Sequence, residues 1–137
     1  AVDCVFCKIV RKVLPSSIIY EDNIVMAFLD IRPLSRGHTL IIPIEHYETV
    51  FDIPEELLAH VHKTAKHVAI AIKKSINADG ISIIQQNGKA ANQDIFHLHV
   101  HIIPMMEGQK LPHFSNLMPA RREQLDQIAA KIKKELS

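Results

Sequence analysis

One segment constrains this chain more than any other: residues 96–104, Phe-His-Leu-His-Val-His-Ile-Ile-Pro, in which histidine and apolar residues alternate. Alternation with a period of two predicts a β-strand over residues 97–103 that Pro104 ends. The three histidines then share one face, about 6.6 Å apart along the strand, while Leu98, Val100 and Ile102 enter the core. Exposed strand faces ordinarily carry Thr, Lys or Glu, so this row of His97, His99 and His101 predicts a functional site.

The residue type leaves three interpretations of that row. A neutral imidazole can act as a nucleophile while a neighbouring imidazole acts as an acid, roles that suit a side chain titrating near neutral pH. Two imidazoles on one strand face, here His99 and His101, can instead chelate one metal ion. The third interpretation, solvent-facing histidines without a role, explains the row least well.

The rest of the chain predicts a single α+β domain over residues 1–137. Apolar spacing indicates a short helix over 5–13, a long amphipathic helix over 54–76 and a closing helix over 119–136. Residues 18–20 and 24–29 form a predicted hairpin, and residues 39–42 and 81–84 form two further strands. Together with the histidine strand this makes a sheet of about five strands. We expect the sheet to be antiparallel, because strands and helices do not alternate along the chain as they do in parallel α/β folds.

Composition excludes several classes of partner. The chain has 137 residues and a formal net charge of +1, from 16 basic and 15 acidic residues, with no polybasic stripe. Nucleic acid and anionic membrane surfaces are therefore not expected partners. No apolar run reaches the roughly 20 residues of a membrane-spanning helix. We expect a soluble, cytoplasmic protein.

Two smaller features complete the residue-level analysis. Cys4 and Cys7, the two cysteines of the chain, are too close in sequence to close a long loop by a disulfide, so reduced thiols or a metal site are favoured. Asp30 ends a predicted strand, where an aspartate can form a turn before Pro33. The aperiodic segment 105–116 is expected to border the site.

The segment from His97 to Ile103 resembles the histidine triad (HIT) superfamily, whose pattern His-φ-His-φ-His-φ-φ, with φ apolar, it matches at every position. Further landmarks resemble the family in order: residues 4–9, 27–31, 37–43, and Asn87-Gly88 before Gln93. The resemblance implies a HIT-like fold and a homodimer, in which the 54–76 helix is the natural contact.

The resemblance also implies roles for individual residues. His99 would be the nucleophile, His101 would bind a phosphate oxygen and assist the leaving group, and His38 would orient His99. Other residues would bind the nucleotide: Phe6, Ile9, Phe28 and Ile31 around the base, Asp30 at the ribose, and Asn87 and Gln93 near the phosphate. For Asn87 an ordinary Asn-Gly turn is the alternative. Asp94 departs from the nucleotide-binding branch, where a small hydroxyl residue commonly follows the glutamine, and it is not assigned a catalytic role.

The implied activity is hydrolysis at the α-phosphate of a purine nucleotide derivative, a phosphoramidate or a dinucleoside polyphosphate, through a nucleotidyl-histidine intermediate. Nucleotidyl transfer to another acceptor and a non-catalytic nucleotide sensor or adaptor are the alternatives. Family members that carry two such cysteines join them to two histidines, here His46 and His97, around a structural zinc ion. Packed, reduced cysteines are the alternative for Cys4 and Cys7. The chemistry at His99 needs no metal.

Overall fold

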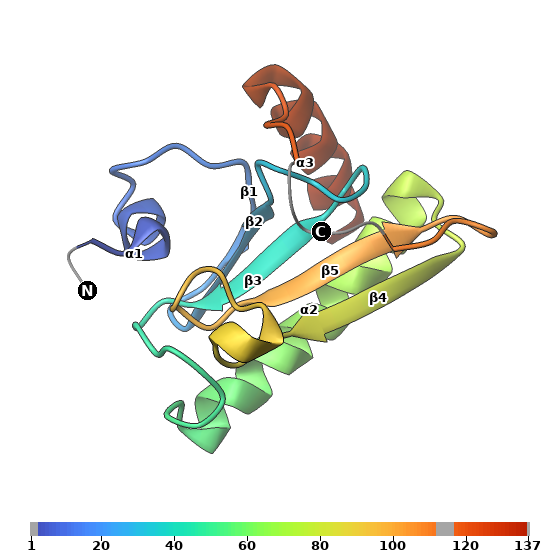
Figure 1. Ribbon diagram of the computed structural model, residues 1–137. Helices are drawn as coiled ribbons and strands as arrows, with labels where there is room; N and C mark the ends of the chain where they lie inside the picture. The colour runs from blue at the N-terminus through green and yellow to red at the C-terminus, as the bar shows by residue number, and fades with distance from the viewer. Residues whose placement is uncertain (1–2, 112–116, 137) are drawn as a thin grey trace.

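The computed structural model describes residues 3–111 and 117–136, and they form an antiparallel sheet with helices on both faces (Figure 1). The elements in chain order are α1 (Val5–Val10), β1 (Ile18–Glu21), β2 (Val25–Leu29), β3 (Thr39–Pro43), α2 (Glu55–Ile76), β4 (Gly80–Gln85), the 3₁₀ turn η1 (Lys89–Ala91), β5 (Val100–Met105) and α3 (Arg122–Leu136). The five strands lie in the order β1-β2-β3-β5-β4. The predicted α+β class and five-stranded antiparallel sheet are confirmed.

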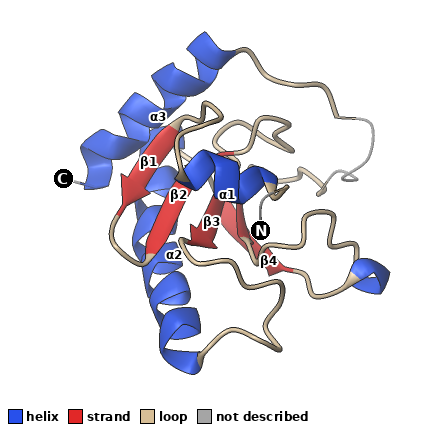
Figure 2. Ribbon diagram, turned by 90° about the vertical axis from the view of Figure 1, so that its left-hand side faces the viewer, coloured by secondary structure: helices blue, strands red, loops and turns tan. Residues whose placement is uncertain are grey.

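The central strands bury both of their faces. One face of the sheet carries Val25, Ala27 and Ile41 and packs against the apolar sides of α2 and α3. The other face carries Met26, Phe28, Leu40 and Ile42 and packs against Phe6 and Ile9 of α1. Figure 2 shows α1 on the side of the sheet opposite to α2. Every residue of β2 and β3 is accordingly buried, which explains their continuous apolar composition.

Helix α2 has the expected length because its ends are well defined. Pro54 precedes its first turn in an extended conformation, and Glu55 and Glu56 follow there, where negative charge suits the helix dipole. Asn77 ends the helix in the left-handed conformation (φ 59°), and its N–H donates to the Lys73 carbonyl. The prediction of a long amphipathic helix is confirmed.

The histidine strand differs from the prediction at both ends. It begins at Val100 and not at residue 97, because its partner β3 ends at Pro43, which has no N–H to donate to a ladder. It continues through Pro104 to Met105, because Pro104 pairs with Ile81 of β4 while its other edge has no neighbouring strand. There the Pro104 carbonyl accepts a hydrogen bond from Ser35 Oγ (2.7 Å).

Two predicted helices are shorter than expected. Helix α1 ends at Val10, because Lys12 takes a left-handed conformation (φ 63°) that lets Val13 N–H bond back to the Lys8 carbonyl. Helix α3 begins at Arg122 and not at residue 119, since the Ala120 N–H donates to the Ile31 carbonyl (2.7 Å). Part of the segment 105–116, residues 112–116, lies outside the described residues.

Candidate active site and metal centre

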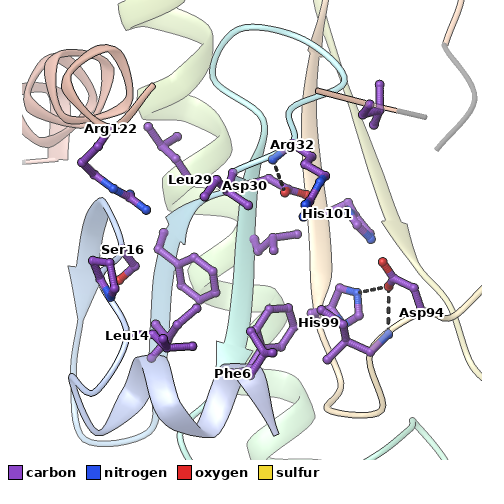
Figure 3. Close-up of a pocket in the computed structure, with 18 residues that line it drawn as sticks. Phe6, Leu14, Ser16, Leu29, Asp30, Arg32, Asp94, His99, His101 and Arg122 are labelled. Atoms are coloured by element: carbon purple, nitrogen blue, oxygen red, sulfur yellow. Dashed lines mark hydrogen bonds and ion pairs between the residues drawn. The ribbon is translucent and has the colours of Figure 1, made fainter. Parts of the chain in front are cut away.

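The α1 face of the sheet holds a cavity of about 390 Å³, a size typical of small-ligand sites. Phe6, Ile9 and Phe28 give it apolar walls, and the polar lining comes from Ser16, Asp30, Arg32, Asp94, His99, His101 and Arg122. His99 and Asp94 lie on one side of this pocket, with Phe6 beside them (Figure 3). His101 is opposite Leu40 of β3 in the sheet, so it also points to the α1 face.

His99 presents Nε2 to the pocket, because a hydrogen bond occupies its other ring nitrogen. Its Nδ1 lies 2.8 Å from the His97 carbonyl oxygen. Because a carbonyl can only accept, Nδ1 carries the hydrogen and Nε2 of the neutral ring carries the lone pair. The ring is 4% exposed and stacks edge-on against Phe6, with centroids 5.1 Å apart. A buried imidazole fixed in this tautomer is suited to act as a nucleophile through Nε2.

The backbone amide of Leu34 determines the tautomers of His38 and His101. Leu34 N–H donates to His38 Nδ1 (3.0 Å), so the hydrogen of His38 is on Nε2. That Nε2–H donates to His101 Nδ1 (3.0 Å), which leaves the hydrogen of His101 on its own Nε2. Burial lowers the pKa of His38 to about 3 and that of His101 to about 4, so both rings are neutral at pH 7. His101 is therefore a hydrogen-bond donor, and the hydrogen bond of His38 goes to His101 and not to His99, the residue it was expected to orient.

Asp30 lies at the end of β2 between the histidines and the apolar walls. Its Oδ1 accepts the Arg32 N–H (3.0 Å), so the turn interpretation is confirmed for that oxygen. Its Oδ2 lies 3.5 Å from His38 Nε2 at the pocket. Burial raises the pKa of Asp30 to about 6. A carboxylate with one oxygen used in the turn can still offer the other to a ribose hydroxyl.

The shifted pKa values of Asp30, His38 and His101 predict how the free energy of unfolding depends on pH. The folded pKa of Asp30 is raised from 3.8 to about 6, so its contribution to the free energy of unfolding falls as pH rises through that window. The lowered pKa values of His38 and His101 act oppositely, because below about pH 6.5 the unfolded chain binds more protons. We expect stability to rise from pH 4 to 6.5.

The Asp30→Asn variant should rise more steeply than wild type over this window. The difference should be roughly 2 to 3 kcal/mol, because about two pKa units of opposing titration are removed. Urea unfolding of both proteins at intervals between pH 4 and 7 measures it. Parallel curves would show that Asp30 titrates with its ordinary pKa in the folded protein.

The structure does not bring all predicted nucleotide residues to the cavity. Phe6, Ile9, Phe28, Asp30, Ile31, His99 and His101 all line it. Asn87 does not: its Oδ1 accepts the Val50 N–H (2.7 Å). Gln93 is buried, and its amide connects Gly88 N–H to the carbonyls of Glu48 and Ile95. Both residues shape the loop between β4 and β5, and a phosphate contact by either stays a prediction.

Several pocket residues were not assigned a role from the sequence, and four of them are polar: Ser16, Arg32, Asp94 and Arg122. Asp94 Oδ1 lies 3.5 Å from His99 Nε2, and the hydrogen bond and positive charge that a protonated His99 offers there lower the pKa of Asp94, which is a carboxylate at pH 7. Attack through Nε2 requires the neutral His99 ring, in which this pairing is absent. Arg122 reaches the cavity from α3, far along the chain from the histidines. A sequence signal for Arg122 exists, since a basic residue in the first turn of a helix opposes the helix dipole.

Cys4, Cys7, His46 and His97 form a compact cluster whose ligand atoms all lie within 4.8 Å of one another. The Nδ1 atoms of His46 and His97 are 3.2 Å apart. Cys7 Sγ lies 3.4 Å from His46 Nδ1, and Cys4 Sγ lies 3.4 Å from His97 Nδ1. Tetrahedral zinc with ordinary bond lengths separates two nitrogens by about 3.3 Å and a nitrogen and a sulfur by about 3.6 Å.

The protonation state of His97 also fits a metal. His97 Nε2 lies 2.8 Å from the Pro43 carbonyl, so Nε2 carries the hydrogen and Nδ1 directs its lone pair into the cluster. A second group, Asp30, His38 and His101, is equally compact but does not fit. There the Leu34 amide occupies His38 Nδ1 and keeps a hydrogen on Nε2, the atom a metal would need.

Fold and site together define a class: a small α+β protein with a ligand pocket lined by a buried histidine row, beside a Cys₂His₂ cluster. The model of the HIT domain family matches residues 11–108, and the chain belongs to this family. In the described part of the chain, no helix is long and apolar enough to span a membrane.

The curated relatives include named enzymes as well as uncharacterised HIT-like proteins. It is 38% identical over 136 residues to an adenosine 5′-monophosphoramidase of Saccharomyces cerevisiae, covering 97% of this chain and 80% of the relative. It is 44% identical over 105 residues to an adenylylsulfatase of Arabidopsis thaliana, covering 77% of this chain and 53% of the relative.

Solved structures agree with the fold along nearly the whole chain. A HIT-like protein of Bartonella henselae superposes with a TM-score of 0.94 at 40% identity, covering 99% of this chain and 98% of the other. A zinc-bound histidine triad family protein of Mycobacterium smegmatis superposes with a TM-score of 0.87 at 37% identity, covering 98% and 94%.

Proposed function

We propose that this protein is a nucleotide hydrolase that releases a nucleoside monophosphate from a purine nucleoside phosphoramidate or a related phosphoanhydride. The observation that carries the proposal is the tautomer of His99, whose Nδ1–H donates to the His97 carbonyl and whose Nε2 lone pair meets the pocket. Relatives named adenosine 5′-monophosphoramidase and adenylylsulfatase support hydrolysis at a nucleotide phosphate.

The proposed chemistry has two displacements at phosphorus. His99 Nε2 attacks the α-phosphorus, a P–N bond forms, and the bond to the leaving group breaks. His101 Nε2–H binds a phosphate oxygen and so assists departure of the leaving group, which takes its proton from water because the neutral His101 ring has no spare proton to give. Water then attacks the same phosphorus and loses a proton to solvent, the P–N bond breaks with its electron pair returning to His99 Nε2, and the nucleoside monophosphate leaves. Asp30 accepts ribose hydroxyls, and the base lies against Phe6 and Phe28.

A transient covalent adduct tests this proposal. Wild-type protein is mixed with a purine nucleoside phosphoramidate, quenched rapidly without acid and examined by intact mass spectrometry. We expect a short-lived gain of one nucleotidyl group during turnover. Binding of nucleoside monophosphate with neither adduct nor turnover would favour the sensor or adaptor function, and product formed only with an added acceptor would favour nucleotidyl transfer.

Asp94 makes a prediction about the leaving group. Its carboxylate, 3.5 Å from His99 Nε2, repels negative charge at the reacting phosphate. Asp94→Asn should therefore raise kcat/KM for a substrate with an anionic leaving group, such as an adenylyl sulfate, about tenfold more than for an amine leaving group. Asp52→Asn, at an exposed aspartate outside the pocket lining, is the control. Equal effects on both substrates would show that Asp94 does not select by charge.

We further propose that Cys4, Cys7, His46 and His97 hold a structural zinc ion. The tautomer of His97 and the four donor separations support it, and so does the zinc-bound relative of known structure. The ion would fix α1, which supplies Phe6 and Ile9, to the segment before β5 that carries His97 and His99.

We also propose a homodimer through the exposed side of α2, where Ile70 is 45% exposed, and light scattering in solution tests it.

A further inference from the structure

The beginning of α3 forms part of the pocket. Leu117 and Arg122 both line it, although the match to the HIT family model ends at residue 108. The Ala120 N–H donates to the carbonyl of Ile31, itself a lining residue (2.7 Å). The segment that leads into α3 is thus bound to the rim of the cavity by its backbone, and Arg122 has a defined place there.

The guanidinium of Arg122 is held in that place by a short chain of polar contacts. Its Nη1 donates to Ser17 Oγ (2.7 Å), and Ser17 Oγ donates to Asp126 Oδ1 (2.7 Å). Ser17 is buried, and Asp126 lies one helical turn after Arg122. A cation in the first turn of a helix is electrostatically unfavourable for the helix. The position of Arg122 therefore lowers the stability of α3, and such locally unfavourable residues are often found at functional sites.

Arg122 lies across the pocket from the reacting groups. In Figure 3 its side chain extends from α3 toward Ser16, while His99 and Asp94 lie on the opposite side and Phe6 lies between. A nucleotide with its phosphorus at His99 and its ribose at Asp30 would place its base along the apolar middle of the cavity. The far edge of a purine then faces Arg122.

We propose that Arg122 reads the purine base and selects guanine over adenine, an inference that rests on the proposed nucleotide function. Guanine presents two acceptors, O6 and N7, on one edge, and the planar fork of arginine N–H donors matches such a pair. Adenine presents N7 beside an amino group, so one donor of the fork would meet another donor. An arginine donor left without an acceptor in a partly enclosed site disfavours the wrong base.

Calorimetric dissociation constants for GMP, IMP and AMP test the proposal. IMP shares O6 and N7 with GMP but lacks the 2-amino group, so GMP and IMP should bind alike and AMP roughly tenfold more weakly. Arg122→Met should bring all three to the AMP value, and Arg122→Lys, which keeps the charge without the fork, should recover only part of the preference. Arg121→Met is the matched control, because Arg121 is exposed and pairs with Glu123.

The outcomes distinguish base selection by Arg122 from the proposed nucleotide hydrolase function. Equal affinity of the wild type for GMP and AMP, or an equal loss of both in Arg122→Met, overturns the assignment of Arg122. If a nucleotidyl adduct still forms at His99 in that case, the proposed hydrolase function stands. Absence of binding by all three nucleotides overturns both. Thermal unfolding of Arg122→Met and Arg122→Lys checks that the Ser17 and Asp126 contacts are not needed for folding.

Discussion

A His99→Ala protein is expected to bind a nucleoside monophosphate nearly as well as wild type and to hydrolyse a nucleoside phosphoramidate roughly 10⁴-fold more slowly or worse. The substitution removes the Nε2 that we propose as the attacking atom, while the proposed contacts of Phe6, Phe28 and Asp30 with base and ribose remain. Steady-state kinetics together with calorimetric binding measure the two effects separately. A loss confined to kcat, with the dissociation constant preserved, identifies a nucleophile.

The control for this substitution is His67→Ala, which removes an exposed histidine of α2 and should leave both quantities unchanged. His38→Ala provides a second comparison. Without the His38 Nε2–H donor, His101 is free to place its hydrogen on Nδ1, so the rate should fall while the covalent adduct still forms. A His99→Ala protein that keeps most of its turnover would rule out covalent catalysis through His99.

Loss of the metal is the second large effect that we expect. Wild-type protein should contain one zinc ion per chain, and Cys7→Ser should contain none. Removal of a tightly bound ion should lower the free energy of unfolding by roughly 3 kcal/mol and Tm by about 10 °C for a chain of this size. Elemental analysis gives the metal content, and thermal unfolding with and without a chelator gives the stability.

The chelator distinguishes the ion from the thiol. It should destabilise the wild type and leave Cys7→Ser unchanged, because that variant has no ion to lose. Since α1 supplies Phe6 and Ile9 to the pocket, chelation should also weaken nucleotide binding. If the chelator has no effect on the wild type and the cysteines titrate as free thiols in the native protein, the cluster is packed by reduced cysteines and the zinc proposal fails.

Much of the fold could be predicted because its patterns are local. The alternation of residues 97–103 and the three-and-four spacing of α2 each follow from one repeating backbone geometry. The ends of these elements could not be predicted so well, because they depend on partners. The histidine strand begins three residues late since β3 ends at Pro43, and it passes Pro104 because no strand lies on that edge.

The sequence by itself determined which chemistry is available: three alternating histidines, a pair of cysteines with two residues between them, and an aspartate at a strand end. Only the tertiary structure decided how each group is used, because a tautomer depends on the partner that a distant segment supplies. Leu34, Pro43 and the carbonyl of His97 set the hydrogens of His38, His97 and His99. Folding likewise brings Arg122 of α3 to the pocket. This contact between segments distant in sequence could not be predicted, because it produces no repeating pattern along the chain.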